Sequence, residues 1–148
     1  MSFFNALNTS ASGLSAQRLR MDVLSQNLAN VNTTRTETGG PYRRKGVLFE
    51  AKKEPRDFSE YFDISLHKYD AGQGVRVTQV FDDPTPGPLV YEPGHPDADA
   101  NGYVRMPNVN VVEEMVNLIS ASRSYEANIT SMNTTKAMIA KILEIGRT

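Results

Sequence analysis

The chain has 148 residues, of which 39% are hydrophobic and 22% charged, and its net charge is −1. Such a chain suits one domain with a modest core, and its near-neutral charge argues against binding to bulk nucleic acid or an anionic membrane. The absence of cysteine excludes disulfides, thiolate zinc sites and thiol catalysis. No apolar run reaches the ~20 residues of a membrane span, and the first residues lack the pattern of a cleaved signal peptide. We therefore expect neither membrane insertion nor signal cleavage.

The N-terminal stretch from about Phe4 to Leu28 predicts a long helix with an apolar seam. Seam residues recur at alternating spacings of three and four, which is typical of a coiled coil. Gly13 weakens this helix by up to ~1 kcal/mol relative to Ala, and Asn and Thr residues at 29–34 favour turns that end it. The residues expected to pack within the chain are Phe4, Leu7, Ala11, Leu14, Met21 and Leu28, with Arg18 and Ser25 as polar members of the seam.

The middle of the chain, residues 33–108, differs in character because it contains all eight prolines and eight of the ten glycines. Strands are predicted at 46–51 and 89–91. Alternating apolar residues at 62–66 and 75–81, joined by a Gly-containing loop, indicate a hairpin or a small three-stranded sheet. We expect this insert to project from one end of the helices.

The C-terminal stretch from Val111 to Gly146 predicts a second and longer helix of ~50 Å. Its cap is expected at Asn108 or Asn110, with Glu113 or Glu114 in the first turn. The seam repeats at spacings of four and three. The intrachain seam residues are Met115, Leu118, Tyr125, Ile129, Met132, Ile139 and Leu143, with polar Ser122 and Lys136, and the residues expected to contact other subunits are Val112, Val116, Ile119, Ala137 and Ile142.

The predicted fold is therefore mainly α with a small β insert. Residues 1–32 and 109–148 form two helices paired as an antiparallel coiled coil, and residues 33–108 form the β-containing insert rich in Pro and Gly. The first helix is too short to cover the second completely, so the remainder of the seam should be buried by other subunits.

Three groups of residues carry side chains that can bind ions or charged partners. The segment Asp97-Ala-Asp-Ala-Asn-Gly102 matches the first half of a calcium loop, but its twelfth position is Asn108 rather than a bidentate Glu, so a turn is favoured. His95 and the distant His67 do not predict a metal site. Arg43, with the two basic residues after it, is expected in a solvated loop, although contact with an acidic protein surface stays open. No nucleophile motif or phosphate loop is present, so neither enzyme activity nor a cofactor is predicted.

Several motifs mark the two ends of the chain and the last third of its middle. They are Asn27-Leu-Ala-Asn-Val-Asn-Thr-Thr34, Gly39-Gly-Pro-Tyr-Arg-Arg44, His95-Pro-Asp-Ala-Asp99, Gly102-Tyr-Val-Arg-Met-Pro-Asn-Val109, Glu113-Glu-Met-Val116 and Arg123-Ser-Tyr-Glu-Ala-Asn128. Residues 50–74 carry no such motif.

In these motifs the chain resembles the bacterial flagellar axial (rod and hook) proteins, and among them the subunits of the proximal rod. The resemblance implies a structural subunit that is exported by the flagellar type III apparatus without signal cleavage. It also implies assembly with further copies and other rod proteins into a periplasmic rod that transmits torque.

Two alternatives come from other classes of protein. The same heptads could close into a discrete oligomer, as in a soluble coiled-coil adaptor, and Asp97, Asp99 and Asn101 could form a calcium-binding module. Sedimentation would distinguish a closed dimer from a growing polymer, and calorimetry would detect calcium binding.

Overall fold

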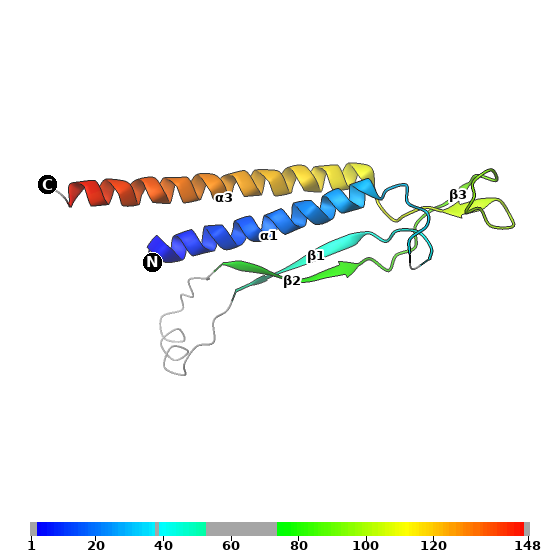
Figure 1. Cartoon of the computed structure of the whole chain (residues 1–148), viewed down its shortest axis with the longest axis horizontal. Helices are drawn as coiled ribbons and strands as arrows, with labels where there is room; N and C mark the ends of the chain where they lie inside the picture. The colour runs from blue at the N-terminus through cyan, green and yellow to red at the C-terminus, as the bar shows by residue number, and fades with distance from the viewer. Residues whose placement is uncertain (1–2, 38, 53–73, 147–148) are drawn as a thin grey trace, which may run out of the picture.

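The computed structural model describes residues 3–37, 39–52 and 74–146. In this part of the chain, two long helices, α1 (Phe3–Ala29) and α3 (Val111–Ile145), run side by side in opposite directions (Figure 1). The expected mainly helical fold with a small β insert is confirmed.

Local hydrogen bonds explain where the helices begin and end. Asn110 is the N-cap of α3, and its Oδ1 accepts from the backbone N–H groups of Val112 (3.1 Å) and Glu113 (3.4 Å). Of the two predicted caps, Asn110 is therefore the one used, and both glutamates lie in the first turn. At the end of α1, the backbone N–H and the Nδ2 of Asn30 both donate to the carbonyl of Gln26.

The insert contains two antiparallel strand pairs in the described residues. Strand β1 (Lys45–Ala51) pairs with β2 (Val75–Asp82), with a bulge between Leu48 and Phe49, and β3 (Leu89–Tyr91) pairs with β4 (Tyr103–Arg105). The strands predicted at 46–51, 75–81 and 89–91 are confirmed, whereas β4 was not predicted. The strand predicted at 62–66 lies outside the described residues.

The two strand pairs take different positions relative to the helices (Figure 1). The β1–β2 pair lies along α1, and the backbone N–H of Val75 donates to Ser12 Oγ at 3.0 Å. The β3–β4 hairpin and the loop that follows α1 extend past the end of the helices. The expectation that the insert projects from one end is therefore wrong for β1–β2, because hydrogen bonds and apolar contacts hold this pair against α1.

Small and polar side chains lie among larger apolar ones in the contact between α1 and α3. A Cβ atom added to Gly13 would lie 3.0 Å from Asn128 Oδ1, so the two backbones approach closely at this level. Ala121 is completely buried and Ala16 nearly so. On α3, the buried and half-buried positions are Glu114, Asn117, Leu118, Ala121, Ser122, Ser124, Tyr125, Asn128, Met132, Thr135 and Ile139.

These positions overlap with the predicted seam, of which Leu118, Ser122, Tyr125, Met132 and Ile139 are half-buried. Glu114, Ala121, Asn128 and Thr135, each one residue before a predicted seam position, are buried or half-buried as well. Five of the residues expected in the intrachain seam are exposed in the single chain: Phe4, Ala11, Met115, Ile129 and Leu143. On α1, Leu7, Leu14, Met21 and Leu28 are half-buried.

Candidate subunit interface and the polar junction beside it

A completely buried asparagine connects the end of α1 to the rest of the chain. Asn27 Nδ2 donates to the Lys45 carbonyl and to Glu114 Oε2, both at 2.9 Å. Its Oδ1 accepts from the Tyr42 hydroxyl and from the Lys45 backbone N–H, also at 2.9 Å. These bonds use both donors and both acceptor positions of the amide, so its burial is fully compensated.

The second buried polar group is Glu114, in the first turn of α3, which is 1% exposed. Its Oε1 accepts from Arg44 Nε at 2.7 Å, and its Oε2 accepts from Asn27. The Arg44 backbone N–H donates to Asn108 Oδ1 at 2.7 Å. A buried carboxylate is costly unless it is paired and hydrogen-bonded, and here both oxygens have partners. Asn27, Tyr42, Arg44, Asn108 and Glu114 are called the polar junction below.

The electrostatic environment of the polar junction changes the pKa of Tyr42. Burial raises the pKa of its phenol above the ordinary 10.0, and the negative charges of Asp82 and Glu114 raise it further. Tyr42 therefore stays neutral and donates to Asn27. The junction joins the end of α1, the start of β1 and the start of α3, and it fixes their relative rotation.

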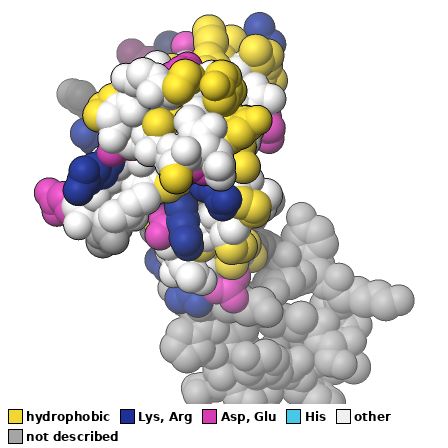
Figure 2. Space-filling model, turned by 90° about the vertical axis from the view of Figure 1, so that its right-hand side faces the viewer, with side chains coloured by type: hydrophobic (Ala, Val, Ile, Leu, Met, Phe, Trp, Pro, Cys, Tyr) yellow, Lys and Arg dark blue, Asp and Glu magenta, His cyan; other side chains and the backbone are white. Residues whose placement is uncertain are grey.

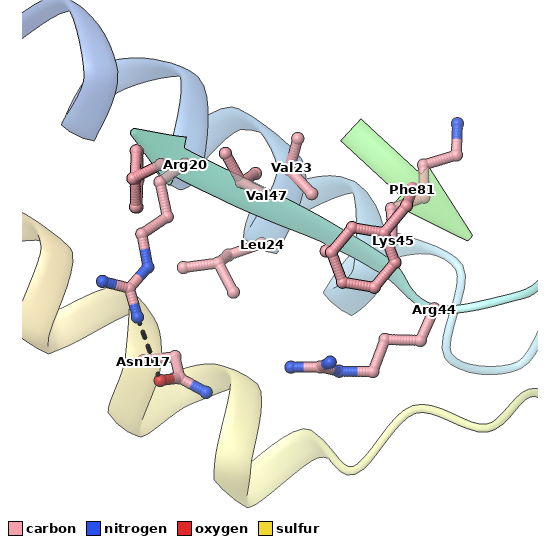
Figure 3. A pocket seen from close by; sticks show the side chains of 10 residues that line it. Arg20, Val23, Leu24, Arg44, Lys45, Val47, Phe81 and Asn117 are labelled. Carbon is pink, nitrogen blue, oxygen red and sulfur yellow. Dashed lines mark hydrogen bonds between the residues drawn. The ribbon is translucent and has the colours of Figure 1, made fainter. Parts of the chain in front are cut away.

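A groove of about 290 Å³ lies beside the junction, between α1, α3 and the β1–β2 pair (Figure 3). Val23, Leu24, Val47 and other apolar side chains line it. Arg20, at one side, donates to Asn117 Oδ1 at 3.3 Å, while Arg44 is bonded to Glu114. The two guanidinium groups thus already bind partners within the chain, which favours a structural role for the groove over recognition of a small molecule.

The outer side of α3 carries large apolar side chains. Near its start, Val112 (71% exposed), Met115, Val116 and Ile119 (53% exposed) recur at the spacing of one helix face. These four residues are called the outer stripe. Near the end of the helix, Met138, Ile142 and Leu143 are also exposed. All five positions expected to contact other subunits, including Ala137, are exposed in the single chain.

The residues considered as a calcium loop form a turn. Asp99 Oδ1 accepts from the backbone N–H groups of Asn101 (2.8 Å) and Tyr103 (3.0 Å), and Gly102 has a positive φ of 80°. Asp97 accepts from the Thr34 hydroxyl at 2.8 Å. The favoured turn is therefore confirmed. Within residues 3–37, 39–52 and 74–146, no group of three His, Asp or Glu side chains is placed to hold a metal ion.

The three basic residues Arg43, Arg44 and Lys45 have different environments in the structure. Arg43 is exposed, whereas Arg44 bonds Glu114 and Lys45 contributes its backbone to Asn27. Sequence reasoning treated this cluster as a surface loop and did not find its role in the junction. Among the described helices, none is long and apolar enough to cross a membrane.

Two family models match the helical segments, and known proteins are similar to nearly the whole chain. A family model described as "Flagella basal body rod protein" matches residues 7–35, and one described as "Flagellar basal body rod FlgEFG protein C-terminal" matches residues 100–145. The flagellar basal-body rod protein FlgC of Bacillus subtilis is 50% identical over 99% of this chain and 100% of its own length. That of Borreliella burgdorferi is 47% identical over 98% of both chains, and that of Salmonella typhimurium 45% identical over 99% of this chain and 100% of its own length.

The chain belongs to the FlgC family of flagellar basal-body rod proteins. It is a structural subunit of the flagellar rod and not an enzyme. The resemblance read from the sequence motifs is confirmed. The first family model covers most of α1 and the turn that follows it, and the second covers β4 and α3. Asn27 lies in the first of these segments and Glu114 in the second, and the two side chains are hydrogen-bonded.

Proposed function

We propose that this FlgC-family chain polymerises through α1 and α3 into a helical tube, the proximal rod, which transmits motor torque. The observation that carries the proposal is the outer stripe of α3, in which four large apolar side chains at one-face spacing point away from α1. Each such side chain contributes roughly 1.5–3 kcal/mol when fully buried. The stripe therefore favours association with a neighbouring helix.

The mode of association follows from where the apolar residues lie. The outer stripe and the apolar residues near Ile142 occupy opposite ends of α3, separated by a mainly polar stretch that includes Arg123 and Glu126. A contact between such different patches is heterologous, and heterologous contacts that do not close produce filaments. In this proposal, neighbouring subunits also cover Phe4, Ala11, Met115, Ile129 and Leu143.

The test replaces apolar stripe residues by charge. Val116→Asp combined with Ile119→Asp should abolish self-association, because carboxylates at a contact with a neighbour would have to be desolvated. Asn133→Asp, on an exposed part of the same helix, is the matched control. Sedimentation and electron microscopy report assembly, and circular dichroism checks that the helices remain.

Two results would overturn the proposal. One is a stripe variant that polymerises as well as the control. The other is a wild-type protein that sediments as a sharp dimer at every concentration, which would instead fit a closed coiled-coil adaptor.

The location and partners of the chain form the second part of the proposal. We propose that it lies in the periplasmic part of the rod, contacts other rod proteins, and is exported by the flagellar type III apparatus without signal cleavage. The support is membership of a rod-protein family. The test compares secretion from cells with and without a functional export apparatus. The exported protein should keep its cytoplasmic size, and a shortened form or secretion without the apparatus would contradict the proposal.

A further inference from the structure

The turn between β3 and β4 contains Asn101-Gly102, the only Asn followed by Gly in the sequence. This hairpin lies at the end of the molecule that faces the viewer in Figure 2, and Asn101 is exposed. Gly has no side chain to shield its own backbone nitrogen from the amide of the residue before it. Every other Asn of the chain is followed by a residue with a side chain. The turn therefore holds the side-chain amide that is most prone to deamidation, one of the reactions that make Asn thermolabile.

The reaction needs no partner other than water. The backbone nitrogen of Gly102 forms a bond to Cγ of Asn101, and the bond between Cγ and Nδ2 breaks. Nδ2 leaves as ammonia with the proton that the Gly102 nitrogen gives up, and a five-membered succinimide remains. Water then opens this ring to aspartate or isoaspartate. The first step requires that the Gly102 N–H be released and that the backbone of Asn101 rotate.

Asp99 opposes both requirements, because it binds three consecutive backbone N–H groups. Its Oδ1 accepts from Asn101 at 2.8 Å and from Tyr103 at 3.0 Å, and its carbonyl accepts from the Gly102 N–H at 3.0 Å. Two further bonds close the turn: the Asp99 N–H donates to the Tyr103 carbonyl and the Glu92 N–H to the Gly102 carbonyl, both at 2.9 Å. The nitrogen that would attack is thus engaged, and the backbone on both sides of it is held.

The turn cannot avoid the reaction by replacing its glycine. Gly102 has a φ of 80°, a conformation that other residues rarely adopt. A Cβ atom at this position would lie 3.0 Å from the Tyr91 ring and 3.1 Å from Pro93 Cβ. The fold therefore requires glycine after Asn101, and protection of the amide has to come from hydrogen bonds.

We propose that Asp99 protects Asn101 from deamidation by holding the backbone of Asn101-Gly102 out of the geometry of attack. This gives a role to the segment that matches half of a calcium loop, in which Asp97 instead accepts from the Thr34 hydroxyl. An isoaspartate at 101 would add a methylene group to the main chain directly before β4. It would thereby disturb the pairing of Tyr103 with Tyr91. The proposal concerns the single chain and does not depend on polymerisation.

The first test needs only the natural chain. Folded protein and protein unfolded in urea are incubated at the same pH and temperature. Trypsin then releases residues 77–105, and mass spectrometry follows the mass gain that conversion of an amide to a carboxylate produces. The folded chain should deamidate at Asn101 at least about tenfold more slowly, because the bonds to Asp99 must first break. Equal rates in the two states would overturn the proposal.

The second test identifies the protecting residue. Asp99→Ala should raise the rate in the folded chain about tenfold. Asp99→Asn keeps an oxygen that can accept the same two side-chain bonds and should retain most of the protection. Glu92→Ala also removes an acidic side chain from this hairpin, and it serves as the matched control with the rate of the wild type.

Two controls keep the second test decisive. Far-ultraviolet circular dichroism reports the helices, and the near-ultraviolet signal of the Tyr91–Tyr103 pair, whose rings lie 5.3 Å apart, reports the hairpin. If folded Asp99→Ala deamidates no faster than Glu92→Ala, Asp99 is not the protecting residue. If Asp99→Ala does not fold, Asp99→Asn decides. A folded Asp99→Asn chain that deamidates as fast as the urea-unfolded protein would overturn protection by hydrogen bonding.

Discussion

On the side of α3 that faces α1, large apolar side chains such as Leu118 and Tyr125 alternate with small or polar ones such as Ala121 and Asn128. On its outer side, Val112, Val116 and Ile119 are large, apolar and exposed. A helix of an isolated globular protein has polar residues on its outer side. The comparison indicates that apolar packing, close backbone approach and hydrogen bonds together hold the helices of one chain, while the exposed apolar side chains are available for the proposed contacts between subunits.

The strongest test of the inner face removes its central hydrogen-bonding group. Asn27→Leu keeps the approximate volume but leaves Glu114 Oε2, the Lys45 backbone and the Tyr42 hydroxyl without a partner. We expect the free energy of unfolding to fall by about 3–5 kcal/mol. Urea unfolding followed by circular dichroism measures it. Gln26→Leu, on the exposed side of α1, is the control and should change stability by less than about 0.5 kcal/mol.

A smaller loss is expected where the helices approach most closely. Gly13→Leu would place a side chain against the Asn128 amide, and such overpacking typically costs about 1–3 kcal/mol. The double variant Gly13→Leu/Asn128→Ala should recover part of this loss, which thermal unfolding would detect. A cost equal to that of Asn8→Leu, an exposed position on the same helix, would contradict the close approach.

The phenol of Tyr42 allows the junction to be tested by pH. Its pKa is raised in the folded chain, so the folded state holds this proton more tightly than the unfolded state does. The corresponding stability is fully present below pH 10 and is lost as the pH rises through the folded pKa. Tyr42→Phe should reduce this alkaline loss and cost about 1 kcal/mol at pH 7 for the hydrogen bond to Asn27. Chemical unfolding at pH 7 and above pH 10 measures both effects, and unchanged alkaline loss would contradict the assignment.

The smallest effect on the single chain is expected on the outer face. Met115 belongs to the seam that the sequence predicts but is about half exposed in the structure. Met115→Ala should therefore change the free energy of unfolding of the monomer by less than about 1 kcal/mol. Leu118→Ala, at a position shared by both versions of the seam, should cost more. Equal losses in dilute protein would favour the seam expected from the sequence.

The sequence predicted the elements better than it predicted their rotation. Long apolar periodicity identified both helices, and alternation identified β1, β2 and β3. Strand β4 has only three residues, too few for a pattern. Part of the predicted seam is exposed in the single chain because two heptad series share Leu118, Tyr125, Met132 and Ile139. Hydrophobicity favours the series with Met115 and Ile129 over the one with Glu114 and Asn128.

The polar junction was missed for a related reason. Asn27 and Glu114 are separated by most of the chain, and each alone looks like a surface residue of a helix. Only the fold places them 2.9 Å apart. The motif around Asn27 did indicate the protein family, but the bonds that explain its asparagine required the structure.

The position of the polar junction has a mechanical consequence. It holds the first turn of α3 at one end of the molecule, while the last turn of α3 lies at the other end. Because α1 packs along α3, the two helices would tilt as a unit. A tilt of about 5° at Glu114 would move the far tip of α3 by roughly 4 Å, over a helix length of ~47 Å. A small change at the polar junction is therefore amplified at the opposite end of the molecule.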